Sequence, residues 1–150
     1  MKNPTLKARI VKIEPGAGYE DKIYDQYVYI ELLNGQILDV FDYEMIANSQ
    51  MIGKVKDITI SASIGTIVKL SETKFGIVPH KENIEYEPSG HGHVFYGKIE
   101  EVDEKYCDLV VDTGVGGILA TPRRDQLKDL NIGDFVRVFG NRTDLDGIHW

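Results

Sequence analysis

The segment Tyr27-Val28-Tyr29-Ile30-Glu31-Leu32, followed by Leu33-Asn34-Gly35 and then by Gln36-Ile37-Leu38-Asp39-Val40, decides the fold class. Its two flanks are rich in β-branched and aromatic residues, which favour extended strands. An Asn-Gly pair between such flanks is the strongest short signal for a β-hairpin, because both residues tolerate the positive φ angles of a tight turn. We therefore predict two antiparallel strands joined at Asn34-Gly35.

Both faces of the first of these strands are apolar. Side chains alternate along a strand, so Tyr27 and Tyr29 share one face while Val28 and Ile30 share the other. We expect one face to lie in the core. The other face is expected either to bind a ligand or to pack against a neighbouring module.

A second hairpin is predicted later in the chain. Residues Cys107–Asp112 lead out, Thr113–Gly116 form the turn, and Gly117–Ala120 return. Short helical phrases follow the two hairpins at Asp42–Ala47 and at Pro122–Leu130. Proline at the first helical position is favoured, and Thr121 before it is a suitable cap.

The chain has the signature of an internal repeat. Arg9–Glu14 and Lys98–Asp103 share a pattern of a basic residue, two apolar residues three apart and a closing acid. Glycine turns follow in the same order, with 18 residues from Gly35 to Gly53 and 17 from Gly116 to Gly133. Internal similarity of this kind decides architecture, so we predict one plan written twice, although chance pairing of common strand patterns is the alternative.

Each unit ends with two further predicted strands: Val55–Ser63 with Gly65–Leu70, and Phe135–Phe139 with Leu145–Trp150. The order in each unit is then three strands, a short helix and two strands, which resembles the OB-fold, a five-stranded Greek-key barrel. The likeness is clearest for residues 95–150, where Ile132-Gly133-Asp134-Phe135-Val136-Arg137-Val138-Phe139-Gly140-Asn141-Arg142 looks like the Gly-Asp turn, fourth strand and glycine-rich hairpin of such barrels. SH3-like barrels use similar turns.

The resemblance implies a mainly β protein of two tandem small five-stranded OB-like (or SH3-like) antiparallel barrels, each with a short helix before the fourth strand. Residues 81–92 are polar and contain Pro88, Gly90 and Gly92, which is typical of a linker. We therefore expect a first barrel over residues 1–80 and a second over residues 93–150. A single merged barrel is the alternative.

Composition excludes several classes of protein. The 150 residues include 17 Lys and Arg, 24 Asp and Glu, and one Cys, so disorder, collagen and a disulfide scaffold are excluded. No apolar run is long enough to cross a bilayer and no leader segment is evident, so we expect a cytoplasmic protein that does not enter membranes. The net charge of −7 repels a polyanion at long range, so any nucleic-acid function needs a local basic patch.

One such patch is predicted in the second unit. Its members are four arginines and three aromatic residues, a combination that would hold phosphates and stack bases of single-stranded nucleic acid: Arg123, Arg124, Arg137, Arg142, Tyr96, Phe139 and Trp150. Alternatively, these arginines pair with nearby aspartates, and the aromatic residues pack in the core or an interface.

A metal site is the alternative for the histidine pair. His91 and His93 are two residues apart, so in an extended chain both imidazoles point the same way and would grip one ion, with a nearby glutamate as a third ligand. The alternative without a metal is a linker that happens to contain histidines. No other cofactor is expected.

The residues favour binding over catalysis. Cys107 begins a predicted strand beside Asp108, and an acid is not a neighbour that activates a thiol as a nucleophile. Our leading hypothesis is a non-catalytic binding module that takes single-stranded nucleic acid on the second barrel. A structural or adaptor protein that forms a homo-oligomer or docks on a protein partner is the second hypothesis, and a metal-dependent enzyme using His91 and His93 is the third.

Overall fold

The computed structural model describes residues 3–79 and 92–149. It is mainly β, with its strands in sheets, which is compatible with a β-barrel-like module. Its elements, in chain order, are β1 (Leu6–Pro15), β2 (Gly18–Tyr19), β3 (Lys22–Ile23), β4 (Gln26–Leu32), β5 (Ile37–Asp42), the 3₁₀ turn η1 (Ser49–Met51), β6 (Val55–Lys69), β7 (Gly76–Pro79), β8 (His93–Asp103), β9 (Asp108–Asp112), β10 (Gly117–Ala120), α1 (Arg124–Leu127) and β11 (Phe135–His149).

Both predicted hairpins are confirmed. Strands β4 and β5 pair antiparallel around Gly35, whose φ of +86° is the positive value that the turn needs. Strands β9 and β10 pair in the same way, and the amide of Thr113 donates to the carbonyl of Gly116 over 2.9 Å. Val28 and Ile30 are fully buried while Tyr27 and Tyr29 are half-buried, so the alternation of β4 sets its core face.

The prediction of two separate strands at the end of each unit is wrong, because each predicted pair is one continuous strand. Strands β6 and β11 are both 15 residues long and pair antiparallel from Val136 opposite Lys69 to His149 opposite Asp57. Gly140 was expected in a hairpin but lies opposite Gly65 within the strands. A Cβ at Gly140 would lie 3.0 Å from that of Ala62, so glycine serves here to let two strands approach closely.

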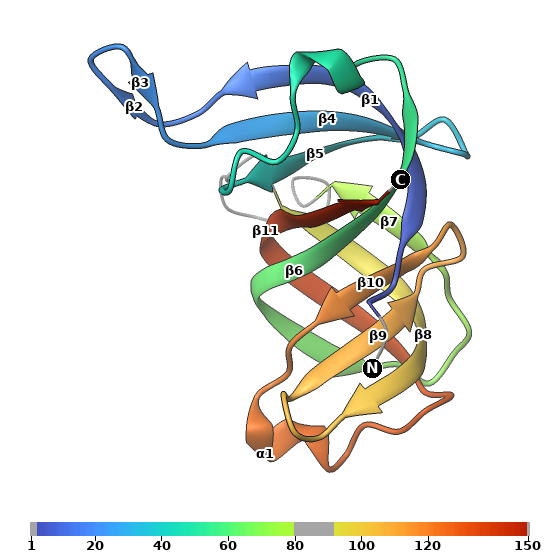
Figure 1. Cartoon of the computed structure of the whole chain (residues 1–150). Coiled ribbons are helices and arrows are strands. Elements are labelled where there is room, and N and C mark those ends of the chain that lie inside the picture. Colours follow the sequence, from blue (N-terminus) through green and yellow to red (C-terminus); the bar gives the residue numbers. More distant parts are fainter. Residues whose placement is uncertain (1–2, 80–91, 150) are drawn as a thin grey trace.

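These two long strands join the halves of the chain. Strands β1, β4 and β5 lie in the upper part of the molecule and β8, β9, β10 and α1 in the lower part, and β6 and β11 run side by side through both (Figure 1). One mixed sheet of nine strands results, in the order β1-β4-β5-β11-β6-β10-β9-β8-β7, with the further pairings β1–β6 and β11–β8. Two separate tandem barrels are not confirmed, because strands of both halves share one sheet.

The helix predicted at Asp42–Ala47 is wrong. The carboxylate of Asp42 accepts hydrogen bonds from the amides of Ile46 (3.0 Å) and Ala47 (2.9 Å), and Met45 has a φ of +57°. A side chain that captures these amides competes with the helical pattern of backbone bonds. The segment therefore forms a turn. In the connection between β5 and β6, the 3₁₀ turn η1 is the one helical element.

The second predicted helix, Pro122–Leu130, is shorter than expected. Helix α1 has four residues, and its N-cap is Arg123, whose side chain makes no capping bond. The hydroxyl of Thr121, the expected cap, donates instead to the carboxylate of Asp108 over 2.9 Å.

Two turns of the chain make equivalent contacts. The amide of Gly53 donates to the carbonyl of Ile10 over 2.7 Å, and the amide of Gly133 donates to the carbonyl of Ile99 over 2.8 Å. Ile10 and Ile99 are both fully buried, and a β-bulge follows each of them in β1 and β8. The glycine turns that the sequence pattern aligned thus occupy matching places.

One hydrophobic cluster contains buried side chains from both halves, including Ile10, Ile30, Ile58, Leu109 and Leu145. Most of the linker predicted at residues 81–92 lies outside the described residues. The division into barrels over 1–80 and 93–150 stays a prediction.

Candidate ligand-binding face

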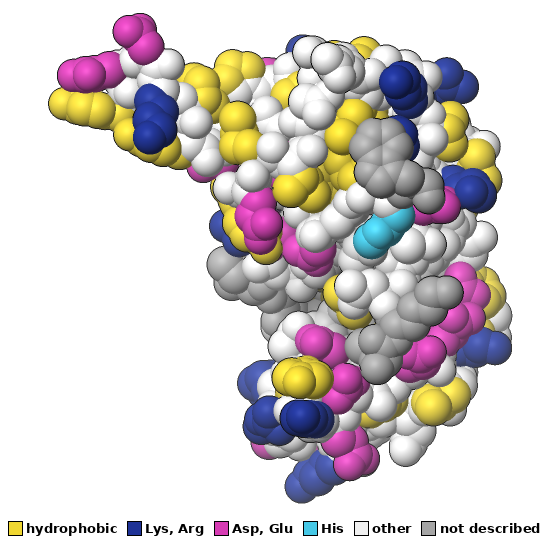
Figure 2. Space-filling view, in the orientation of Figure 1, with side chains coloured by type: hydrophobic (Ala, Val, Ile, Leu, Met, Phe, Trp, Pro, Cys, Tyr) yellow, Lys and Arg dark blue, Asp and Glu magenta, His cyan; other side chains and the backbone are white. Residues whose placement is uncertain are grey.

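Basic and acidic side chains are mixed over the side of the molecule that Figure 2 shows. At the lower end of the body, Lys and Arg stand beside Asp and Glu. Binding of a polyanion needs a surface that is locally positive. The environment of each predicted arginine therefore decides whether it is available to a ligand.

Arg123 and Arg124 lie at the start of α1 (Figure 1), and the side chain of Gln126 in this helix donates to the carbonyl of Ile67 in β6. The Nε atom of Arg123 lies 3.2 Å from the carboxylate of Asp125, and Arg124 donates to the backbone carbonyls of Glu104 and Lys105.

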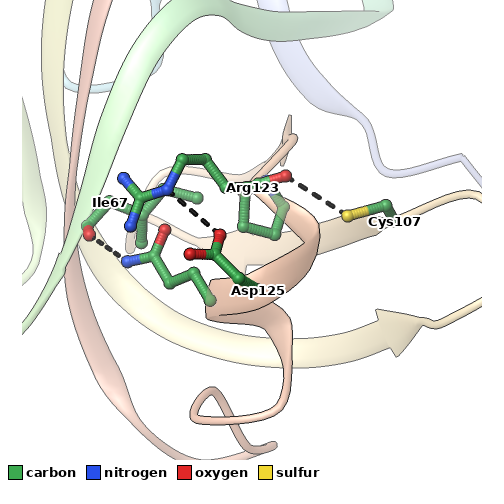
Figure 3. A network of polar contacts seen from close by, with 6 residues as sticks. Ile67, Cys107, Arg123 and Asp125 are labelled. Atoms are coloured by element: carbon green, nitrogen blue, oxygen red, sulfur yellow. Dashed lines mark hydrogen bonds and ion pairs between the residues drawn. The ribbon is translucent and has the colours of Figure 1, made fainter.

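The single cysteine, Cys107, lies in the same region and has a structural contact there. Cys107 is buried, and its thiol donates to the carbonyl of Pro122 over 3.2 Å, as Figure 3 shows. This contact ties the turn before β9 to the segment that leads into α1.

Arg142 is occupied by an internal partner. It donates to both carboxylate oxygens of Asp144, over 2.6 and 3.2 Å, and its guanidinium carbon lies 4.7 Å from the ring centre of Phe41. The hydrogen bond to Asp144 raises the pKa of Arg142. Asp146 follows close by, and partial burial raises the pKa of this carboxyl, with the charges of Asp144 and Glu44 adding to the effect.

Aromatic rings also surround Arg142, but carboxylates lie close to the same rings. The ring of Phe41 lies 5.3 Å from that of Tyr27 and 6.3 Å from that of Tyr43, centre to centre. Burial raises the pKa of Tyr43, and nearby carboxylates such as Asp146 contribute in the same direction. This part of the surface is therefore poorly suited to a polyanion.

Arg137 lies in a different setting. Val136 and Val138 of β11 are buried, so Phe135, Arg137 and Phe139 point away from the core. Arg137 is exposed and stands opposite Tyr96 of β8 and Val68 of β6 in the sheet register. Directly opposed residues in an antiparallel pair have Cβ atoms about 5 Å apart, so these side chains are neighbours.

This outer surface, which we call the Arg137 face, combines cations and rings. It comprises Lys74, Phe75, Lys98, Phe135, Arg137 and Phe139, and Tyr96, which is only 9% exposed, packs against Lys74. The ammonium of Lys74 lies 4.0 Å from the ring centre of Tyr96, and the rings of Phe75 and Phe135 meet edge to face at 5.3 Å. Lys98 stands opposite Phe135 on β8.

The three cations of the Arg137 face have no ion-pair partner in the described part of the chain. No carboxylate of residues 3–79 or 92–149 lies within 4.0 Å of a side-chain nitrogen of Lys74, Lys98 or Arg137. The nearest acid in register is Asp112, opposite Lys98, and its carboxylate accepts the amide of Gly114 over 2.9 Å. The face therefore offers three cations that no carboxylate of the described residues pairs with, in a chain of net charge −7.

A shallow pocket of about 360 Å³ adjoins the Arg137 face. It is lined by the turn between β4 and β5, by the start of β7 and by β8: Asn34, Gln36, Lys74, Phe75, Gly76, Ile77, Val78 and Tyr96. Two residues of the pocket, Lys74 and Tyr96, are also in mutual contact. The pocket and the Arg137 face thus form one continuous surface.

The structure brings together three of the predicted ligand-binding residues, Tyr96, Arg137 and Phe139. It gives Arg123, Arg124 and Arg142 internal partners instead. Trp150 lies outside the described residues. The sequence interpretation missed Lys74, Phe75 and Lys98 as partners of Arg137. The alternation Phe135-Val136-Arg137-Val138-Phe139 is the signal that could have shown that Phe135 and Arg137 share one face.

The histidine pair is only half described, because His91 lies outside the described residues. His93 is 2% exposed, and its Nδ1 atom lies 2.7 Å from the hydroxyl of Thr143 while its Nε2 atom lies 3.6 Å from a carboxylate oxygen of Asp39. Within residues 3–79 and 92–149, no three His, Cys, Asp or Glu side chains form a group that would hold a metal ion. A metal site that includes His91 stays a prediction.

In the described part of the chain, no helix has the length and apolar character needed to cross a lipid bilayer. Comparison of the chain with protein-family models, with curated proteins and with solved structures gave no match.

Proposed function

We propose that this protein is a non-catalytic binding module that holds single-stranded nucleic acid on the Arg137 face. One observation carries the proposal: Lys74, Lys98 and Arg137 lack ion-pair partners among the described residues and lie beside aromatic rings. Arginine and lysine neutralise phosphates, and aromatic side chains stack on bases of any sequence. Because the overall charge is negative, a polyanion binds only where the surface is locally positive.

Binding is favoured over catalysis by the chemistry of these groups. Lysine and arginine stay protonated at neutral pH, and phenylalanine rings transfer no protons. Such a surface positions a polyanion without supplying an acid, a base or a nucleophile for a reaction.

We further propose that the sheet consists of two interlocked OB-like barrels. The pairings β1–β4, β4–β5, β5–β11, β11–β6 and β6–β1 form one closed circuit, and β8–β9, β9–β10, β10–β6, β6–β11 and β11–β8 form a second. Each circuit has four antiparallel pairings and one parallel pairing, at β5–β11 and at β10–β6. The matching contacts of Gly53 with Ile10 and of Gly133 with Ile99 support a duplicated unit.

The nucleic-acid proposal is tested by fluorescence anisotropy with labelled single strands of about 12 nucleotides. We expect binding at about 20 mM salt that weakens steeply at about 200 mM, because phosphate contacts release counterions. Lys98→Glu is expected to weaken binding by about tenfold, whereas Lys105→Glu, the same charge change at the turn before β9, has little effect. Absence of binding at low salt, or equal effects of the two variants, would overturn the proposal.

The second candidate function, self-association, is favoured by the arm formed by β2 and β3. This arm projects from the body (Figure 1) and exposes Tyr19 (70%), Ile23 (43%) and Tyr24 (51%). Its base is fixed, since the amide of Ala17 donates to the carboxylate of Asp25 over 2.6 Å. We expect a concentration-dependent dimer in light scattering that the double variant Tyr19→Ser/Tyr24→Ser abolishes. A monomer at all concentrations would remove this candidate.

A further inference from the structure

The pocket beside the Arg137 face contains two amide side chains whose orientations are set by backbone partners. The side-chain nitrogen Nε2 of Gln36 donates to the carbonyl oxygen of Ile77, an atom that only accepts. The oxygen Oε1 of Gln36 is therefore left as an acceptor. This assignment follows from the partner and leaves no freedom to exchange the two ends of the amide.

Asn34 is oriented by the same logic in the opposite sense. The backbone amide of Gln36 donates to Oδ1 of Asn34 over 3.0 Å. The amide nitrogen Nδ2 of Asn34, a donor, is left for other partners. The turn between β4 and β5 thus supplies one donor and one acceptor, both on residues that line the pocket.

A ring and a cation complete the pocket. Phe75 is 45% exposed, and its edge-to-face contact with Phe135 fixes the ring against the sheet. Lys74 adds a second donor, held against the ring of Tyr96. The pocket therefore offers two donors, one acceptor and an exposed aromatic ring.

We propose that this pocket holds one base of the bound strand and prefers uracil or thymine. The inference rests on the proposed function and identifies which part of the ligand is read. The pairing edge of uracil and thymine presents two carbonyl acceptors around one N–H donor, which matches the two donors and one acceptor in number. Cytosine and adenine place an amino donor on this edge and fit less well. The ring of Phe75 stacks on the base, and Lys98 and Arg137 hold the adjoining phosphates.

Anisotropy titrations with oligothymidylate, oligocytidylate and oligoadenylate of equal length test this inference. We expect the wild-type protein to bind oligothymidylate at least about fivefold more tightly than oligocytidylate, since a hydrogen-bonded base edge discriminates by roughly that factor or more. The variant Asn34→Asp keeps the oxygen that accepts from Gln36 and keeps a residue suited to the turn, but it removes the donor. We expect it to abolish the preference.

The ratio of two affinities is the readout, so the added negative charge of Asn34→Asp cancels. Arg137→Ala is the matched control, because it is expected to weaken binding to both strands equally and to leave the ratio unchanged. Equal wild-type affinity for all three strands, or an unchanged ratio in Asn34→Asp, would overturn the base pocket while the proposed function stands. Absence of binding to every strand would overturn the proposed function itself.

Discussion

The guanidinium of Arg142 grips the carboxylate of Asp144 through two hydrogen bonds of 2.6 and 3.2 Å. An arginine held in this way has its charge compensated inside the protein. Arg137, five residues earlier in the same strand, has no such partner in the described part of the chain. Two arginines that look alike in the sequence therefore differ in what they offer to a ligand.

This difference predicts opposite phenotypes for two alanine variants. Arg137→Ala is expected to weaken binding of a single strand by about threefold to tenfold at low salt and to reduce the salt slope by about 0.7, the loss of one phosphate contact. Arg142→Ala is expected to leave affinity unchanged and to cost about 1 kcal/mol of stability, because the lost ion pair is half-exposed. Anisotropy at several salt concentrations and urea unfolding measure the two effects. The reverse pattern would place the ligand at Phe41 instead.

The buried carboxylate of Asp42 predicts a large stability effect. It is fully buried and accepts the amides of Ile46 and Ala47 and the side-chain amide of Gln26. Asp42→Ala would remove two buried hydrogen bonds and one part-buried one, and we expect a loss of about 3 kcal/mol. Asp42→Asn is also expected to destabilise, since its amide nitrogen would face another donor. Urea unfolding checks both variants, and a loss below about 1 kcal/mol in Asp42→Ala would contradict this account.

Glycines of this fold are expected to differ in their tolerance to alanine. Gly53 and Gly133 have φ angles of +88° and +96°, and an added Cβ would meet nothing within 4 Å. Their alanine variants should each lose about 1–2 kcal/mol, the cost of a left-handed conformation. At Gly97 an added Cβ would lie 2.0 Å from the carbonyl oxygen of Asp112, so Gly97→Ala should be much more damaging. Thermal unfolding ranks the three, and equal losses would be inconsistent with these geometries.

Asp134 predicts a specific loss of stability in acid. The backbone amide of Asn131, 2.9 Å from the carboxylate, holds the pKa of Asp134 below its ordinary value of 3.8, and Lys69 at 3.3 Å acts in the same direction. A carboxyl with a lowered folded-state pKa contributes stability above its ordinary value and loses it as the pH falls through the folded-state value. Asp134→Asn should therefore reduce stability at neutral pH and flatten its acid dependence below about pH 4. Unfolding curves across this range test it; parallel pH profiles for variant and parent would argue against it.

Local chemistry made the hairpins predictable, and long-range pairing made the rest of the fold unpredictable. Asn34-Gly35 and the strand residues beside it are sufficient to specify β4 and β5. Gly140 was expected in a turn, but it faces Gly65 across β6 and β11, and a Cβ added to it would lie 3.0 Å from that of Ala62. A pairing between segments some 75 residues apart leaves no trace in the pattern of either segment.

Only the part of the candidate site that lies on one strand could be predicted from the sequence. Alternation along β11 places Phe135, Arg137 and Phe139 on one face, and this can be deduced from the residues alone. Lys74 and Phe75 reach that face through the loop between β6 and β7, and Asn34, from the turn of the other half, lines the pocket beside it. Such meetings depend on the arrangement of whole strands, which periodicity does not encode.

The sharing of β6 and β11 sets an order of events during synthesis. When β6 leaves the ribosome, its principal partner β11 has not been translated. The N-terminal half therefore keeps a long strand edge unpaired until β11 is made. Arrival of β11 satisfies that edge and closes the late half in the same step. Maturation of this chain is accordingly a single late event, and any pause in translation between Lys69 and Phe135 prolongs the interval in which newly made chains are exposed to aggregation.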